Sequence, residues 1–177
     1  MLAPPGVSFW GYSVISNVLR SSVLVVAGAV LSGCIYSGGA EAVQHMDPVV
    51  ARGAHIDTIN VTVANGMQGQ ELATIMPEVL RQELNTCATG SQPLHLEVNV
   101  TGFKGQNAAM TILLGDGAKL QGTAKLIEPK TNQVVGDYDV SESVGGGGIL
   151  AAAGMADAER SLSQEFAESL CKQAFRS

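Results

Sequence analysis

Three cysteines have the widest choice of chemistry in this sequence, because a thiol can be acylated, oxidised or bound to a metal. Cys34 follows a marked order of residues: the basic Arg20, the apolar run Val23 to Leu31, and the small Ser32 and Gly33. A basic end stays on the cytoplasmic side while the apolar run enters the bilayer, and small residues let a peptidase hold extended backbone. The order predicts an export signal that ends at Cys34.

Leu31-Ser32-Gly33-Cys34 resembles the lipobox of bacterial lipoproteins. The resemblance implies that residues 1–33 are a signal peptide, that cleavage falls between Gly33 and Cys34, and that Cys34 carries diacylglycerol and acyl chains such as palmitate. The apolar run of about 13 residues is shorter than the roughly 20 that span a bilayer. An uncleaved signal anchor or a buried cysteine in a hydrophobic helix is the alternative.

The residue after Cys34 is Ile35 rather than Asp. By resemblance to the sorting rules of enterobacterial lipoproteins, this implies the periplasmic face of the outer membrane, with the inner membrane left open. The long stretch before Arg20 also leaves the true start codon open. The expected location is therefore the cell envelope, with the chain bound to a membrane through acylated Cys34.

Cys87 and Cys171 are the thiols that remain once Cys34 is acylated. Both fall near the ends of predicted helices, and the envelope is an oxidising compartment that allows a disulfide. Bridging needs Cα atoms within about 7 Å, which a sequence does not reveal. A Cys87–Cys171 disulfide and two buried free thiols are both compatible with the sequence.

The three histidines, His45, His55 and His95, include no pair at the i, i+4 spacing of a helical metal site. His95 and Glu97 fall on the solvent-exposed face of a predicted strand. A solvated strand face is the expected interpretation of that pair, and a weak metal or proton site is the alternative. We therefore expect no metal site and no cofactor.

Ser141 and Ser143 flank Glu142 without the Gly-x-Ser-x-Gly pattern of a nucleophile elbow. Residues 145–148 are four glycines with no following Lys-Ser or Lys-Thr, so a phosphate loop is not predicted. The small apolar run at residues 149–155 either docks against lipid or a neighbouring subunit or simply packs at the start of the last helix. No catalytic residue emerges, and we expect a protein that is not an enzyme.

The chain has 177 residues, enough for one domain, and its formal net charge is −6. Its lysines and arginines are scattered singly, whereas nucleic-acid binding needs them clustered. Residues 34–54 are Gly-, Ala- and polar-rich without a sustained period, and Asp47-Pro48 is expected to break any helix. This segment is predicted to be a flexible tether, followed by a periplasmic α+β domain over residues 55–177.

Hydrophobic periodicity within the domain predicts strand, helix, three strands, helix. The expected elements are strands at residues 56–63, 94–101, 119–127 and 134–144 and amphipathic helices at residues 69–87 and 157–175. Pro77 requires that the first helix either starts near Thr74 or kinks. The order favours a four-stranded, mostly antiparallel sheet with both helices packed on one face.

Short segments between residues 56 and 175 resemble small envelope lipoproteins of uncharacterised function, with a layout like that of curli-secretion, exopolysaccharide-export and transporter-auxiliary lipoproteins. The segments are residues 77–84, 114–118, 126–132, 145–148 and 156–160. The resemblance bears on fold more than on activity. For the function, we expect a lipid-anchored, non-enzymatic binding or assembly module, accessory to an export or transport complex. Its partner would be an envelope protein or a second copy of the chain. A lipoprotein that holds a small apolar molecule or lipid between helices and sheet is the alternative.

Overall fold

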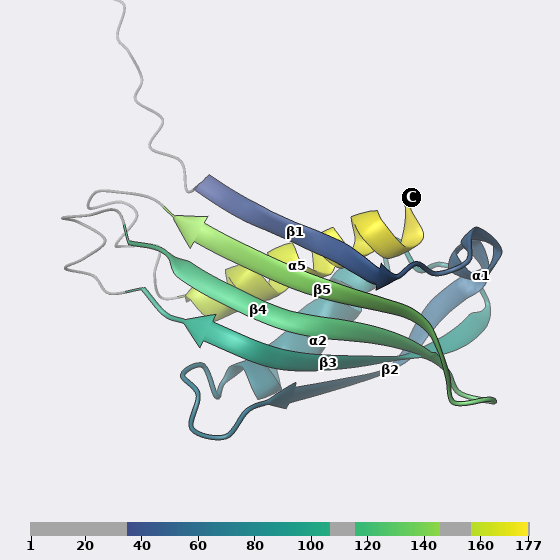
Figure 1. Cartoon of the computed structure of the whole chain (residues 1–177), viewed down its shortest axis with the longest axis horizontal. Helices are drawn as coiled ribbons and strands as arrows, with labels where there is room; N and C mark the ends of the chain where they lie inside the picture. The colour runs from purple at the N-terminus through teal and green to yellow at the C-terminus, as the bar shows by residue number, and fades with distance from the viewer. Residues whose placement is uncertain (1–34, 107–115, 146–156, 177) are drawn as a thin grey trace, which may run out of the picture. The chain divides into compact units, whose positions relative to one another are not determined.

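The structure, a computed structural model, describes residues 35–106, 116–145 and 157–176 (Figure 1). The elements in this part of the chain are β1 (Ile35–Gln44), α1 (Pro48–Gly53), β2 (Ala54–Val63), α2 (Leu72–Leu84), β3 (Gln92–Lys104), β4 (Ala118–Glu128), β5 (Gln133–Gly145) and α5 (Ala158–Phe175). The strands form one five-stranded sheet in the order β1-β5-β4-β3-β2. β2 and β3 run parallel, and the other neighbouring pairs are antiparallel.

The core lies between the sheet and the two long helices, α2 and α5, which cover the same face (Figure 1). Strand alternation supplies one side of this core, because successive side chains point to opposite faces. In β3, for example, Leu94, Leu96, Val98 and Val100 are buried. The helices supply the other side with buried residues at helical spacing: Leu72, Met76, Val79, Leu80 and Leu84 from α2, and Leu162, Phe166, Leu170 and Ala174 from α5.

A glycine in the central strand allows close packing of α5. A Cβ atom at Gly122 would lie 3.4 Å from the Phe166 ring and 2.9 Å from the Asn99 carbonyl oxygen. The fully buried Phe166 ring therefore lies over strand backbone that carries no side chain on this face. This contact fixes α5 against the middle of the sheet.

The α+β class and the packing of two long helices on one face are confirmed, but the predicted count of elements is wrong. The described residues contain five strands and three helices, where the periodicity predicts four strands and two helices. The extra strand, β1, and the extra helix, α1, both fall within residues 34–54. This segment is therefore not a flexible tether from Ile35 onward.

The missed elements have a physical explanation. β1 pairs antiparallel with β5, from Ile35 opposite Gly145 to Gln44 opposite Asp137, so backbone hydrogen bonds hold a segment with few large apolar side chains. Asp47-Pro48 begins α1 instead of breaking it. The Asp47 carboxylate accepts a hydrogen bond of 2.7 Å from the Val49 amide, and Pro48 takes the first helical turn, where its missing N–H costs nothing.

α2 connects the parallel strands β2 and β3, as a crossover helix must. The helix begins at Leu72, two residues before the predicted start at Thr74, and Pro77 lies inside it. At that position Pro77 cannot donate to the carbonyl of Ala73, so one ladder hydrogen bond is missing. The burial of the apolar face of α2 compensates for this loss.

The predicted turn after β4 is confirmed. It is a tight connection in which the Asn132 amide donates to the Glu128 carbonyl at 2.9 Å. Asn132 has a φ of 57°, in the left-handed region that asparagine tolerates better than most side chains. The turn sets the register of β4 and β5.

Candidate functional site

The sheet face opposite the helices is a polar surface. Hydroxyl, amide and charged side chains alternate with the buried residues along each strand and point to this face. In one row across the sheet, Glu41 lies opposite Asp139, Asp139 opposite Thr123, Thr123 opposite Asn99, and Asn99 opposite Thr62. We call this surface the open face.

Two shallow depressions lie on the open face. The first is bordered by Gly39, Glu41, Thr101, Gln121, Thr123, Asp139 and Ser141. The second is bordered by Asn60, Thr62, Glu97, Asn99, Thr123 and Lys125. Thr123 belongs to both, so it marks the centre of the open face. Shallow, polar depressions of this kind fit a protein surface better than an enclosed small molecule.

The charges on the open face are unevenly paired. Lys125 Nζ lies 3.8 Å from Asp137 Oδ2. Lys104 Nζ lies 2.6 Å from Asp116 Oδ1, and this hydrogen bond holds the pKa of Asp116 below its usual value. Glu41 and Asp139, in contrast, are two acidic residues directly opposite each other in neighbouring strands. Like charges in that position repel each other, so a cationic partner group would relieve a cost that already exists.

A separate cavity of about 360 Å³ lies at one end of the sheet, where α1 meets the β4–β5 turn. Its walls include apolar side chains from four segments: Val50, Pro93, Leu94, Pro129 and Val135. Gln92, Glu128, Lys130 and Gln133 provide the polar part of the wall. The volume is at the small end of the range seen for ligand pockets.

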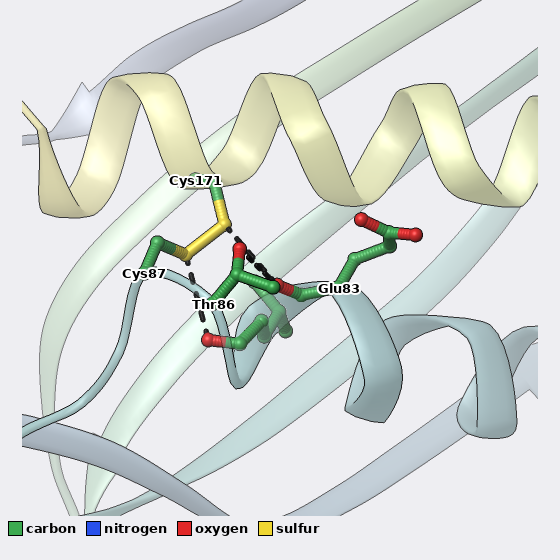
Figure 2. The surroundings of a disulfide bond; sticks show 5 residues. Glu83, Thr86, Cys87 and Cys171 are labelled. Atoms are coloured by element: carbon green, nitrogen blue, oxygen red, sulfur yellow. Dashed lines mark hydrogen bonds between the residues drawn. A yellow bond between two sulfur atoms is a disulfide. The ribbon is translucent and has the colours of Figure 1, made fainter.

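Cys87 and Cys171 are joined by a disulfide with a Cα–Cα distance of 5.9 Å. Figure 2 shows that the bridge links the turn that follows α2 to α5. Cys171 Sγ lies 3.9 Å from the Glu83 carbonyl oxygen, which also accepts a hydrogen bond of 2.8 Å from Thr86 Oγ1. The bridge fixes the two long helices to each other over the same face of the sheet.

The other predicted chemical groups do not come together. His45 is exposed, His55 is half-buried, and His95 Nε2 lies 4.0 Å from Asp57 Oδ2 at the surface. Within residues 35–106, 116–145 and 157–176, no group of three His, Cys, Asp or Glu side chains could hold a metal ion. Ser141 points to the open face and the buried Glu142 to the helices, so strand alternation separates these neighbours.

The burial of Glu142 was not predicted from the sequence. Glu142 is 3% exposed, on the helix side of β5. The signal for this position was its phase, because Tyr138, Val140 and Val144 share the same face at a period of two. A carboxylate in phase with buried apolar residues is a buried carboxylate unless the strand is interrupted.

Gly33 and Cys34, the predicted cleavage and lipidation sites, lie outside the described residues, as do residues 146–155 with most of the glycine and apolar runs. In the part of the chain that the structure describes, no helix has both the length and the apolar character to cross a membrane.

The geometry defines a class: an α+β domain in which a five-stranded sheet carries two disulfide-linked helices on one face and a polar surface on the other. No family model matches the sequence, and no curated protein matches it either.

Solved structures with a related architecture include two from Paraburkholderia phytofirmans, both PelC dodecamers, one of them a single-residue variant. The variant is 16% identical and covers 78% of this chain and 98% of its own, with a TM-score of 0.46. The other is 15% identical over 78% and 99%, with a TM-score of 0.44. A protein of Caulobacter crescentus CB15 assigned as a lipoprotein is 15% identical over 64% and 84%, with a TM-score of 0.37. Likenesses of this size carry no statement about activity or partners.

Proposed function

We propose that this chain is a lipid-anchored protein of the cell envelope that acts as a binding or assembly module without catalytic activity. In this proposal residues 1–33 are removed, Cys34 is acylated, and the domain works at the periplasmic face of the outer membrane. The lipobox-like residues Leu31-Ser32-Gly33-Cys34 support the anchor. The Cys87–Cys171 disulfide supports an oxidising compartment, because such bonds are rare in cytosolic proteins.

The observation that carries the binding role is the open face. It extends over all five strands, and α2 and α5 both pack on the opposite side. The neighbouring acidic residues Glu41 and Asp139 give it a local negative charge next to hydroxyl and amide groups. Such a surface suits an envelope protein with basic and hydrogen-bonding groups, within an export or transport complex, or a second copy of the chain.

The anchor is tested by Cys34→Ser, which replaces the sulfur that would be acylated. We expect labelled palmitate to be incorporated into the wild-type chain and not into the variant, and the variant to leave the membrane fraction. Unchanged labelling and fractionation would exclude the lipoprotein assignment.

The open face is tested by Thr123→Arg, which places a long cation at the centre of both depressions. Gln82→Arg, on the exposed side of α2, is the matched control with the same charge change. Cross-linking in intact cells, followed by identification of the linked partner, is compared among the three proteins. We expect the cross-linked species to be lost in Thr123→Arg alone, and its survival would exclude the open face as the binding surface.

The apolar part of the end cavity favours a second candidate function, the binding of a small apolar molecule or lipid. Val50→Arg would place a charge at the wall that α1 contributes. If this function is correct, denaturation of the wild-type protein should release a bound lipid that mass spectrometry detects. No such lipid should be released from Val50→Arg. Protein that carries no releasable molecule would exclude it.

A further inference from the structure

Glu142 of β5 is enclosed between β1 and α5, two elements that lie far apart in the sequence. Its strand partner on one side is Gly38 of β1, and on the other side Leu120 of β4. α5 packs over both β5 and β1. A Cβ atom at Gly38 would overlap Glu142 Oε2, so the carboxyl group occupies the space that a side chain on β1 would otherwise fill.

The surroundings of Glu142 disfavour its charged form. Burial is the main cause that raises the pKa of Glu142 above the ordinary value of 4.5. A side-chain hydrogen bond with Ser169 lowers it. α5 also presents Glu165 and Glu168, which raise the pKa further, and Lys172, which lowers it. β1 contributes one titratable group on this face, the phenol of Tyr36, and the β4 partner Leu120 contributes none.

The carboxyl group is also incompletely hydrogen-bonded. Glu142 Oε1 is buried without a hydrogen-bond partner among the described residues. A buried polar atom without a partner costs free energy, and the cost is much larger for a carboxylate than for a neutral carboxylic acid. Docking of β1 therefore competes with ionisation of Glu142.

Few apolar contacts hold β1 in its docked position. On its helix side, Ala40 and Ala42 are half-buried, Gly38 has no side chain, and Tyr36 is 42% exposed. As an edge strand, β1 has β5 as its one neighbour in the sheet. Its position depends on the hydrogen bonds to β5 and on the contact with α5 that surrounds Glu142.

We propose that β1 is a pH-controlled strand, docked against β5 and α5 when Glu142 is protonated and released from them when Glu142 is ionised. When β1 leaves, Glu142 becomes hydrated and regains ordinary acidity. Docking is then strongest below the ordinary pKa of 4.5 and weakens as the pH rises through the higher pKa of the docked state. Release exposes the edge of β5 to strand addition by a partner. This inference goes beyond the proposed function and does not require acylation of Cys34.

The test is amide hydrogen exchange of the full chain, purified in detergent, followed by mass spectrometry between pH 4.5 and pH 8. Exchange times are corrected for the intrinsic pH dependence, and β3 serves as the internal reference. We expect the protection of residues 35–44 to fall relative to β3 as the pH rises across this range, by up to about tenfold for each pH unit between the two pKa values.

Two variants make the test specific. Glu142→Gln is neutral at every pH, so protection of β1 should become independent of pH. Glu78→Gln removes an exposed carboxylate from α2 and should keep the wild-type profile. Equal pH profiles for β1 and β3 in the wild type, or a pH slope that persists in Glu142→Gln, would overturn the proposal.

A direct titration covers the case in which Glu142→Gln fails to fold. In the wild-type protein, the chemical shift of the Glu142 carboxyl carbon is followed by NMR as the pH is raised. We expect its midpoint to lie above the ordinary glutamate value of 4.5. A midpoint at or below that value would overturn the proposal independently of any variant.

Discussion

The two edges of the sheet are attached in different ways. At the β2 edge, Ile56 and Ile59 are 6% and 9% exposed, and α2 packs against the strand as part of the core. At the β1 edge, the corresponding side chains are alanines and a glycine, and a buried carboxyl group fills the space between strand and helix. The comparison indicates that the β2 edge is held by apolar burial, whereas the β1 edge is held mainly by hydrogen bonds and by the charge state of one residue.

The largest effect is expected from the bond that holds α2 to α5. The Cys87–Cys171 disulfide closes a loop with a sequence separation of 84. Replacing both cysteines by alanine should lower the free energy of unfolding by about 4 kcal/mol, because the unfolded chain regains the entropy of that loop. Urea unfolding of the two proteins measures the difference. A loss below about 1 kcal/mol would mean that packing alone holds the helices together.

The next effect concerns the β2 edge. Leu80 of α2 is fully buried, and Leu80→Ala should cost about 3 kcal/mol, because it removes apolar contacts and leaves a cavity. The loss should appear as lower stability of the whole domain in thermal and urea unfolding. If only the residues of β2 lose exchange protection while β4 stays fully protected, α2 and β2 are not part of one cooperative core.

The β1 edge should respond more weakly and locally. A Cβ atom at Gly38 would overlap the Glu142 carboxylate and the Ser141 carbonyl oxygen, whereas a Cβ at Gly39 meets nothing within 4 Å. Gly38→Ala should destabilise by about 1–2 kcal/mol, and Gly39→Ala is its matched control. Hydrogen exchange should show faster exchange confined to residues 35–44. Similar behaviour of both variants would contradict the contact between β1 and Glu142.

The smallest effect is expected on the open face. Lys125 and Asp137 form a partly exposed ion pair at 3.8 Å, and such pairs contribute little because water already solvates both groups. Lys125→Ala should change the free energy of unfolding by less than about 1 kcal/mol. A larger loss in urea unfolding would indicate that the open face stabilises the domain and is not simply available for binding.

The comparison of the edges also explains which parts of the fold were predictable. β3 was predictable because Leu94, Leu96, Val98 and Val100 alternate with polar residues, and this local pattern reflects the two faces of the sheet. β1 lacks such a pattern. Its pairing with β5 joins Ile35 to Gly145 across most of the chain, and no local property of a Gly- and Ala-rich segment reports so distant a partner.

The candidate site was predictable only in part. Cys87 and Cys171 could be named as a pair, but their distance depends on how α2 and α5 pack. The open face required knowledge of both the strand order and the side on which the helices lie. Glu142 was in phase with buried residues throughout, yet a charged residue in a strand is assumed to face water unless the packing around it is known.

The antiparallel register of β1 has a mechanical consequence. If Cys34 is fixed in a membrane, any tension between membrane and domain enters the fold at Ile35, whose partner is Gly145 at the end of β5. A pull away from the sheet would load that first pair, then the next, in the manner of a zipper. Under such tension β1 would detach from β5 first. Its freed residues would extend the connection to the membrane while the core stays folded.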